Sequence, residues 1–505
     1  MIFNNDPSHA SRWGDERTSN PGRRKFLKVA ATSALGAGVV PGALAAGEAS
    51  AQAGPHHPKS ETKRIEVDFS KSIGTIKALN GVNGGPLANF NLSSYFSAMG
   101  IPHVRLHDIP YMYPGHDVVD VQYIFPNPEA DVDDPDSYDF RMTDHYIQSI
   151  RALGAQITYR LAYGTWGKNN PHPRPTPPQD YARWAKICSH IVRHYNQGWS
   201  NGFHNVVQYW EIWNEPDIKI FWSGTPEQYY RLYEVTSKAV KAADPESKVG
   251  GPTMAKAAGK EFFDGFLKHC ADHEAPLDFA SWHIYAKKPE HVAANAAIVH
   301  DALQKHGFTK TESILDEWNY FLGDWNSEHK DAEYRKWLFN TQVGGPPGAA
   351  YAASVLMRLQ DSTVGLLDYY QGTTHYWGGL FDEFGAPRKP CFTFEAFKHL
   401  LGTPKRVFTS GSDDSGFAVM AGLAKDKSEA TVLISNFGTP YNRYEIAFHG
   451  LPWKESFAYE KYVVDAHHNL DLAMSENIRT PTLSVAEEVE NPSVCMIRLR
   501  SAASA

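Results

Sequence analysis

The chain has 505 residues, of which 42% are hydrophobic and 21% are charged, and its formal net charge is −8. This length exceeds what one ordinary compact core fills, so we expect a large domain with an accessory unit. The negative charge, with no long Lys/Arg run in the body of the chain, argues against a nucleic-acid-binding protein, because a phosphate backbone is bound by clustered cations.

The N-terminus has the pattern of an export signal. Gly-Arg-Arg-Lys at 22–25 precedes an apolar run over 29–46, and Ala-Ser-Ala at 49–51 forms a small-x-small cleavage site. This order predicts a twin-arginine signal peptide over 1–51 and delivery to the periplasm or the cell exterior. A membrane anchor is the alternative, but Gly and Ala weaken the run, which is barely long enough to span a bilayer. We expect no membrane contact after cleavage.

Residues 76–401 alternate short strand patterns with helical ones. The strand candidates are short runs of β-branched or aromatic residues, as expected for strands buried on both faces. They lie at 78–82, 103–106, 156–161, 207–212, 248–251, 279–284, 313–316 and 366–370. Eight such strands with helices between them predict an α/β fold, a (β/α)8 TIM barrel that forms the catalytic domain.

Two of the intervening helices have clear N-terminal signals. Thr-Pro-Glu-Gln at 225–228 is a capping box with proline at the first helical position, and this helix should end before Pro245. A second helix is expected to open at the two prolines of 177–178, with Cys188 on its apolar face. We therefore expect Cys188, and most of the other three cysteines, to be buried thiols; the four form no CxxC pair.

The pattern changes over 402–505 to short alternating runs separated by Gly, Asn, Asp and Pro. The runs lie at 417–420, 430–434, 443–448, 457–464 and 494–499. This spacing predicts a C-terminal β-sandwich. Residues 52–75 are expected to form a linker and a strand, near 64–69, that joins the sandwich.

Two acidic motifs stand at the ends of expected barrel strands, where barrel enzymes gather their catalytic groups. Trp-Asn-Glu-Pro at 213–216 follows the fourth strand, and Asp-Glu-Trp-Asn at 316–319 follows the start of the seventh. Their glutamates, Glu215 and Glu317, stand in apolar surroundings where an unpaired charge is costly. Two carboxylates on opposite walls suit glycoside hydrolysis, in which one donates a proton and the other attacks the anomeric carbon.

Three nearby charged residues are expected to have supporting roles. Asp316 adjoins Glu317, and strand alternation predicts that it points to the other face. Glu211 lies deeper in its strand and is expected to be a buried structural partner. Arg105 is expected to pair with a carboxylate near the barrel floor.

These motifs resemble glycoside hydrolase family 39, which holds β-xylosidases, α-L-iduronidases and some arabinose- or galactose-directed enzymes. The resemblance rests on Gly-Val-Asn-Gly-Gly at 81–85, Val-Arg-Leu-His-Asp at 104–108, Asn-Glu at 214–215, His-Ile-Tyr at 283–285 and Glu-Trp-Asn at 317–319. It implies a barrel with an attached β-sandwich. It also implies double displacement with retention, with Glu317 as nucleophile and Glu215 as acid/base.

The resemblance implies further substrate contacts at the same face of the barrel. Asn214 should bond the 2-hydroxyl of the sugar, and the other candidate substrate-binding residues are His283, Tyr285, His107 and Trp318. Trp377, after the eighth strand, is a candidate stacking wall, with packing between the domains as the alternative. We expect no cofactor and no metal, because the cluster of His269, Cys270 and His273 is better explained as a helix end.

The expected function is a retaining exo-glycosidase of β-xylosidase type that acts on side chains of oligosaccharides or polysaccharides. The loops at 109–114 and 165–178 depart from the family pattern, and loops at this face of a barrel set substrate specificity. Two alternatives therefore stay open: an arabinose- or galactose-directed, disaccharide-releasing enzyme, and an endo-acting enzyme. An iduronidase is disfavoured because no Lys/Arg cluster meets an acidic sugar. A catalytically inactive carbohydrate-binding protein is the alternative of another class, and two intact glutamates argue against it. The sequence does not specify the oligomeric state.

Overall fold

The computed structural model describes residues 61–86, 91–107, 118–164, 176–257, 259–323, 331–374, 378–454, 456–479 and 483–501. The chain divides into two units, Met1–His57 and Pro58–Ala505, and every described residue belongs to the second. The expected signal peptide, 1–51, lies outside the described residues.

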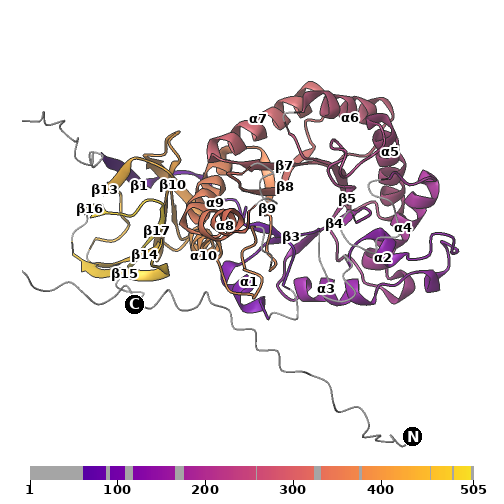
Figure 1. Cartoon of the computed structure of the whole chain (residues 1–505). Coiled ribbons are helices and arrows are strands. Elements are labelled where there is room, and N and C mark those ends of the chain that lie inside the picture. Colours follow the sequence, from indigo (N-terminus) through magenta and orange to yellow (C-terminus); the bar gives the residue numbers. More distant parts are fainter. Residues whose placement is uncertain are drawn as a thin grey trace, which may run out of the picture. The chain divides into compact units, whose positions relative to one another are not determined.

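Eight strands, each parallel to its neighbours, close into a barrel within the described part of the chain (Figure 1). They are β2 (Gly81–Asn83), β3 (His103–Leu106), β4 (Gln156–Leu161), β5 (Tyr209–Ile212), β6 (Lys248–Met254), β7 (Phe279–Ala286), β8 (Glu312–Tyr320) and β9 (Val364–Tyr369). Each expected strand overlaps one of these, so the predicted (β/α)8 barrel is confirmed.

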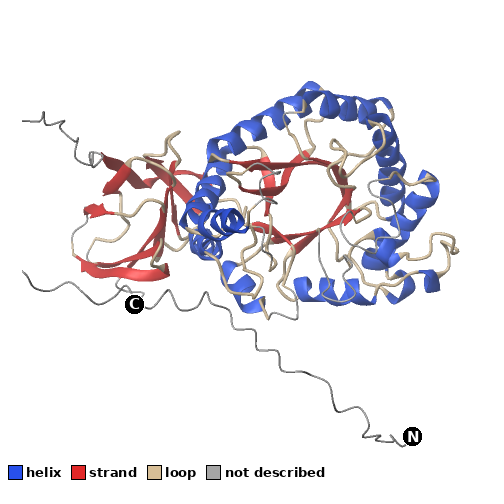
Figure 2. Ribbon diagram, viewed as in Figure 1, coloured by secondary structure: helices blue, strands red, loops and turns tan. Residues whose placement is uncertain are grey.

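Helices form the outer ring of the barrel (Figure 2). They are α1 (Ser93–Met99), α2 (Val121–Ile124), α3 (Arg141–Arg151), α4 (Tyr181–Gln197), α5 (Pro226–Ala243), α6 (Lys260–Asp272), α7 (Pro289–Lys305), α8 (Ala332–Lys336), α9 (Pro346–Arg358) and α10 (Lys389–Gly402). Short turns of helix are η3 (Pro135–Ser137), η4 (Trp199–Asn201), η5 (Trp337–Val343) and η6 (Leu359–Asp361).

The two helix starts that the sequence marks have different outcomes. The capping box of α5 is present, with Thr225 and Gln228 bonded to each other's backbone, and the helix ends at Ala243 as expected. Helix α4 begins at Tyr181 rather than at the prolines of 177–178. Asp180 is its N-cap, because its carboxylate accepts from the backbone N–H groups of Ala182 and Arg183.

The remaining strands form one nine-stranded sheet in the described residues, in the order β15-β14-β17-β12-β11-β10-β1-β13-β16. They are β1 (Glu61–Thr75), β10 (Lys405–Ser410), β11 (Phe417–Leu423), β12 (Glu429–Asn436), β13 (Tyr441–His449), β14 (Phe457–Val464), β15 (Asn469–Ile478), β16 (Leu483–Glu488) and β17 (Ser493–Ser501). The sheet curls on itself, since Tyr459 of β14, the strand next to one edge, donates to Glu487 of β16, the strand at the other edge, at 2.9 Å. The expected sandwich is thus one curled sheet, and the strand before the barrel, β1, belongs to it.

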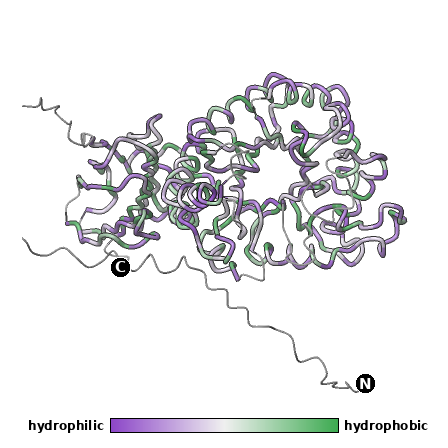
Figure 3. The backbone as a smooth tube through the Cα atoms, viewed as in Figure 1, coloured by the Kyte–Doolittle hydropathy of each residue, from purple (hydrophilic) through white to green (hydrophobic). Residues whose placement is uncertain are grey.

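The barrel and the curled sheet share part of one hydrophobic core. Leu433, Met420 and Met496 from the sheet are buried in the same cluster as residues of α9 and α10, whereas Ile434 faces a second core inside the sheet. Ser435 donates to the carbonyl of Ala350 in α9 at 2.6 Å, which adds a polar link. Hydrophilic residues lie mainly on the outer side of the helical ring (Figure 3).

The four cysteines Cys188, Cys270, Cys391 and Cys495 are all free and buried, as expected. Among the described residues, no helix combines the length and apolar character that a membrane span requires.

Leu433 and Ile434 are adjacent on β12 but face different cores, which makes them a matched pair. We expect each change to alanine to lower the free energy of unfolding by about 2–5 kcal/mol, because each leaves a cavity. Leu433→Ala should also separate the melting of the sheet from that of the barrel, since only Leu433 is in the shared core. Calorimetry measures the number of unfolding transitions in each variant. A single unfolding transition in both Leu433→Ala and Ile434→Ala would contradict a stabilising role for the shared core.

Candidate active site

A constrained turn after β5 carries Asn214 and Glu215. Trp213 and Glu215 have φ of 75° and 45°, values that non-glycine residues adopt only when their surroundings enforce them. Here the backbone N–H of Trp213 donates to Leu161 O at 3.0 Å and that of Glu215 to Thr253 O at 3.0 Å. Two neighbouring strands therefore hold the turn, which places Glu215, 8% exposed, at the carboxyl end of the barrel.

Four described side chains surround the carboxylate of Glu317 on β8. Arg105 Nη1 donates to Oε1 at 2.8 Å and the Tyr285 hydroxyl to Oε2 at 2.7 Å. His107 Nε2 lies 3.1 Å from Oε1, and His283 Nδ1 lies 3.4 Å from Oε2. Burial alone would raise the pKa of Glu317, but the charges of His283, His107 and Arg105 outweigh it and hold the pKa well below its usual range. This glutamate is ionised at neutral pH.

Glu215 has the opposite character. Burial is the main influence and, with the nearby charge of Glu317, raises the pKa of Glu215 to about 7, against the opposing effect of His283. His283 Nδ1 lies 2.7 Å from Glu215 Oε1. Glu215 therefore keeps a proton at mildly acidic pH, where Glu317 has lost its own.

The two glutamates lie close together across the barrel. One side-chain donor or acceptor atom from each of Glu215, His283 and Glu317 lies within 4.8 Å of the other two. A sugar's anomeric carbon and its glycosidic oxygen are neighbouring atoms, so groups at this spacing can act on both.

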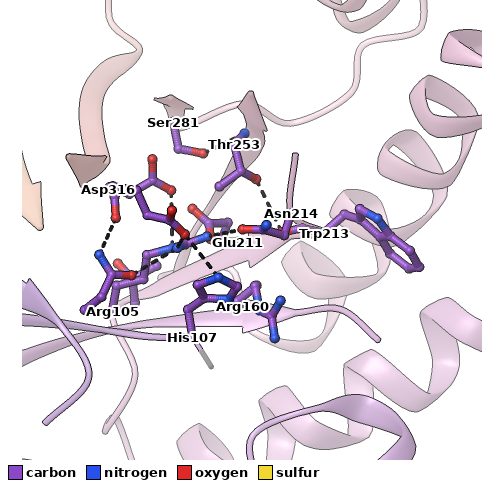
Figure 4. Close-up of polar contacts among 12 residues, drawn as sticks. Arg105, His107, Arg160, Glu211, Trp213, Asn214, Thr253, Ser281 and Asp316 are labelled. Carbon is purple, nitrogen blue, oxygen red and sulfur yellow. Dashed lines mark hydrogen bonds and ion pairs between the residues drawn. The ribbon is translucent and has the colours of Figure 1, made fainter. Parts of the chain in front are cut away.

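Arg105, on β3, lies among acidic and amide side chains that include Glu211, Asn214 and Asp316 (Figure 4). Its guanidinium lies 2.6 Å from Glu211 Oε2 and donates to Asn83 Oδ1 at 3.0 Å and to Asn214 Oδ1 at 2.9 Å. Burial opposes its charge, but Glu211, Asp316 and other carboxylates raise the pKa of Arg105 well above its usual value. The expected pairing with a carboxylate is confirmed, and Glu211 is that buried partner.

The prediction that Asp316 points away from Glu317 is wrong. Pairing between β7 and β8 is regular to Leu315 and resumes at Glu317, with Asp316 skipped. Asp316 is thus the extra residue of a β-bulge, and a bulge interrupts the strict alternation of side chains. Its carboxylate is fully buried inside the barrel, 3.3 Å from Arg105 Nε.

Most of the expected substrate-binding residues gather around the two glutamates. His107, His283 and Tyr285 contact Glu317, as described above, and His283 also contacts Glu215. Asn214 is buried and held by Arg105 through Oδ1, and its amide Nδ2 has no hydrogen-bond partner among the described residues. That amide is free to donate to a ligand.

The expectation for Trp318 is not met. Its indole is fully buried and packs against Tyr369 and against Tyr351 of α9, with ring centroids 5.2 Å and 6.5 Å apart. Alternation resumes after the bulge and turns Trp318 toward the helices, away from the barrel interior. Trp377 lies outside the described residues.

Sequence reasoning missed two residues of the site. Arg105 was expected only as a structural residue, yet it donates directly to Glu317. Tyr370, at the end of β9, has its ring centroid 6.0 Å from that of His107 and 6.3 Å from that of Tyr285. Its position at the carboxyl end of a barrel strand was the available signal.

Two described groups have the spacing of metal ligands. Glu215, His283 and Glu317 form one, but the contacts that Arg105 and Tyr285 make with Glu317 already satisfy its charge. The other is Glu234 with His269 and His273, and Glu234 is already paired with Arg231 and Lys238. Neither group requires an ion to balance its charge.

Two β-xylosidases resemble this chain. The one from Geobacillus stearothermophilus is 33% identical over 298 residues, which are 50% of this chain and 54% of that protein. The one from Caldicellulosiruptor saccharolyticus is 37% identical over 285 residues, 52% of this chain and 55% of that protein. The chain thus spans about half the length of these relatives.

A solved structure of a glucosidase from Croceicoccus marinus matches the fold over more of the chain. It is 26% identical with a TM-score of 0.75, and the match covers 88% of this chain and 100% of that one. Residues 58–321 match the sequence profile of glycosyl hydrolases family 39. That segment is more than half of the chain and includes both Glu215 and Glu317, and the chain therefore belongs to glycosyl hydrolase family 39.

Proposed function

We propose that this protein is a retaining exo-glycosidase in which Glu317 is the nucleophile and Glu215 the acid/base. The observation that carries the proposal is a pair of nearby glutamates with opposite protonation. Arg105, His283 and His107 lower the pKa of Glu317 and hold it ionised, whereas burial raises the pKa of Glu215 to about 7. Retaining glycosidases need their carboxyl groups about 5–5.5 Å apart, and inverting ones about 6.5–9.5 Å. Atoms of Glu215 and Glu317 within 4.8 Å favour retention.

The first chemical step forms a covalent glycosyl-enzyme. A carboxylate oxygen of Glu317 attacks the anomeric carbon while the bond to the glycosidic oxygen breaks. Glu215 gives its proton to that oxygen, so the leaving group departs as a neutral alcohol. Tyr285 and Arg105 donate to Glu317 and hold its carboxylate in place for the attack.

The second step reverses the roles. Glu215, now a carboxylate, accepts a proton from water as the water oxygen bonds to the anomeric carbon and the ester bond to Glu317 breaks. Glu317 is again ionised and Glu215 again protonated. The unpartnered amide of Asn214 donates to the 2-hydroxyl in both steps, a contact that strengthens in the transition state.

The proposed substrate is a β-D-xyloside at the end of an oligosaccharide or polysaccharide side chain. The names of the two similar β-xylosidases support it. A β-glucoside is the second candidate, because the similar glucosidase matches most of this chain, including the curled sheet. Arabinose- or galactose-directed activity and endo action stay open as narrower alternatives.

We also propose that residues 1–51 direct export by the twin-arginine pathway. Paired arginines followed by an apolar run support it. In a bacterial host, the wild type should reach the periplasm or the medium, and a variant with Arg23→Lys and Arg24→Lys should stay in the cytoplasm. Cell fractionation measures this; equal distribution of the two proteins would contradict the proposal.

Aryl glycosides test the substrate and the stereochemistry together. We expect hydrolysis of aryl β-D-xyloside, with the β-anomer as first product in proton NMR, and no activity in Glu317→Ala. Glu215→Gln should lower kcat/KM by roughly 10²–10⁴-fold on substrates that need a proton. The panel includes β-glucoside, β-galactoside, α-L-arabinoside and α-L-iduronide. An inverted product, or full activity in Glu317→Ala, would contradict the assignment.

The pKa values of the two glutamates predict the pH profile. The basic limb of kcat/KM should lie near pH 7, because Glu215 has a pKa of about 7 and acts as an acid only while protonated. The acidic limb should lie below the ordinary glutamate range, because Glu317 keeps its charge there. With an activated aryl substrate, Glu215→Gln should lose the basic limb. If the basic limb is unchanged in Glu215→Gln, that limb reports the titration of another group, and the role of Glu215 as the acid is contradicted.

A further inference from the structure

The proposed mechanism leaves one buried carboxylate without a role. Asp316 is fully buried, and neither of its oxygens accepts a hydrogen bond from a described residue. Its charged neighbours are Arg105, with Nε 3.3 Å from Oδ2, and His283, with Nε2 3.6 Å from Oδ1. An isolated buried charge is costly, so a carboxylate kept at this position calls for an explanation beyond packing.

We propose that Asp316 is a positioning residue that acts through His283: it keeps the imidazole doubly protonated, with Nδ1–H directed at Glu215. The β-bulge is what makes this possible, because it brings Asp316 to the same interior as Glu317. Without the bulge, these two adjacent carboxylates would point to opposite faces of the strand.

The geometry favours a proton on both ring nitrogens of His283. Nδ1 lies 2.7 Å from Glu215 Oε1 and 3.4 Å from Oε2 of ionised Glu317, and a lone pair on Nδ1 would face that second carboxylate, so we place a hydrogen on Nδ1. Nε2 faces Asp316 at 3.6 Å, which is an ion-pair distance rather than a hydrogen bond. A lone pair on Nε2 would face a carboxylate and be repelled, whereas an N–H is attracted. A neutral ring can satisfy one of these contacts, and only the imidazolium satisfies both.

The electrostatic environment of His283 agrees with this geometry. Burial alone would lower the pKa of His283, but Glu317, Asp316 and Glu215 raise it well above its usual value. Burial likewise raises the pKa of Asp316, and the charges of Arg105 and His283 outweigh it and keep Asp316 ionised.

The titratable and charged groups around His283 come from several elements. They are Arg105 and His107 from β3 and its end, Glu211, Glu215 and Asp217 from β5 and the turn after it, Tyr285 on β7, and Asp316 and Glu317 on β8. Burial raises the pKa of Glu211 well above its usual value.

The role of this cation follows from the double displacement, so this step rests on the proposed function. In the free enzyme His283 lies beside ionised Glu317; in the glycosyl-enzyme Glu317 is a neutral ester and Glu215 is the carboxylate. His283 is within 3.4 Å and 2.7 Å of the two, so it balances either charge without moving. Asp316 keeps the proton on His283 in the second state, so that Glu215 stays a base for the attacking water.

Histidine-selective ¹⁵N labelling tests the protonation state directly, and His283→Gln identifies the resonance. In the wild type we expect both ring nitrogens to show imidazolium shifts that stay constant up to about pH 8, above the ordinary histidine pKa of about 6.5. In Asp316→Asn the ring should lose a proton within the range pH 5–8. A neutral His283 in the wild type at pH 7, or equal titration in both proteins, would overturn the proposal.

Glu211→Gln is the matched control. It changes a carboxylate of the same cluster that contacts Arg105 and not His283, so His283 should stay doubly protonated. A ring that titrates in both Glu211→Gln and Asp316→Asn would show a general effect of the cluster, and would overturn a specific role for Asp316. If Asp316→Asn does not fold, the wild-type titration alone still decides, since a neutral ring excludes the proposal.

Kinetics supply the second readout. With an aryl glycoside whose leaving group is good, the second step limits kcat. Asp316→Asn should impair base catalysis by Glu215 in that step. We therefore expect it to lower kcat about tenfold or more and to change kcat/KM less. Equal loss in kcat and kcat/KM would overturn the role in the second step. The NMR result does not depend on activity, so a failure of the proposed function and a failure of this inference are distinguishable.

Discussion

Charge balance in the buried interior of the barrel is the constraint on which this site depends. Two cations, Arg105 and His283, lie among carboxylates at the carboxyl ends of the strands, and each charge taken from water costs several kcal/mol unless it is paired. The pKa values of Glu317 and Asp316 are lowered, whereas burial raises the pKa of Glu211 well above its usual value and that of Glu215 to about 7. The difference between the two proposed catalytic glutamates is therefore a property of the group rather than of either residue alone.

Backbone geometry decides which carboxylates join that group. The turn after β5 holds Glu215 in a left-handed conformation, and the bulge in β8 brings Asp316 beside Glu317. Both are departures from regular structure at the point where chemistry is expected, and such departures persist only where surrounding contacts stabilise them. Here Arg105 supplies much of that stabilisation, because it contacts residues from β2, β5 and β8 at once.

Much of the fold was predictable because buried parallel strands are continuous apolar runs that a sequence displays directly. Strands β10, β15 and β16 were not predicted, since Val407 is the one buried residue among them. The two glutamates were predictable from charge in apolar surroundings at strand ends. The placement of Asp316 and Trp318 was not, because both depend on one bulge that no local sequence signal marks. The direct contact of Arg105 with Glu317 depends on which strands face each other across the barrel.

The curled sheet has its own core and also shares one with the barrel, through Leu433 and its neighbours on the face toward α9 and α10. None of the described residues that contact Glu215 or Glu317 comes from this sheet. We infer that the sheet stabilises the helices behind β8 and β9 and contributes nothing to the bond-making steps. The specificity of the enzyme then depends on the loops at the carboxyl face of the barrel.

The proposed mechanism requires a covalent bond between Glu317 and the sugar. Incubation with an activated 2-deoxy-2-fluoro-β-D-xyloside, and with its glucoside counterpart, followed by peptide mass spectrometry, tests it most directly, because fluorine at carbon 2 slows release of the glycosyl-enzyme. We expect one added sugar per chain, on the peptide that contains Glu317, with at least one of the two reagents. A sugar attached to a different residue would contradict this mechanism. So would hydrolysis of the ordinary xyloside or glucoside if the corresponding fluorinated reagent forms no adduct.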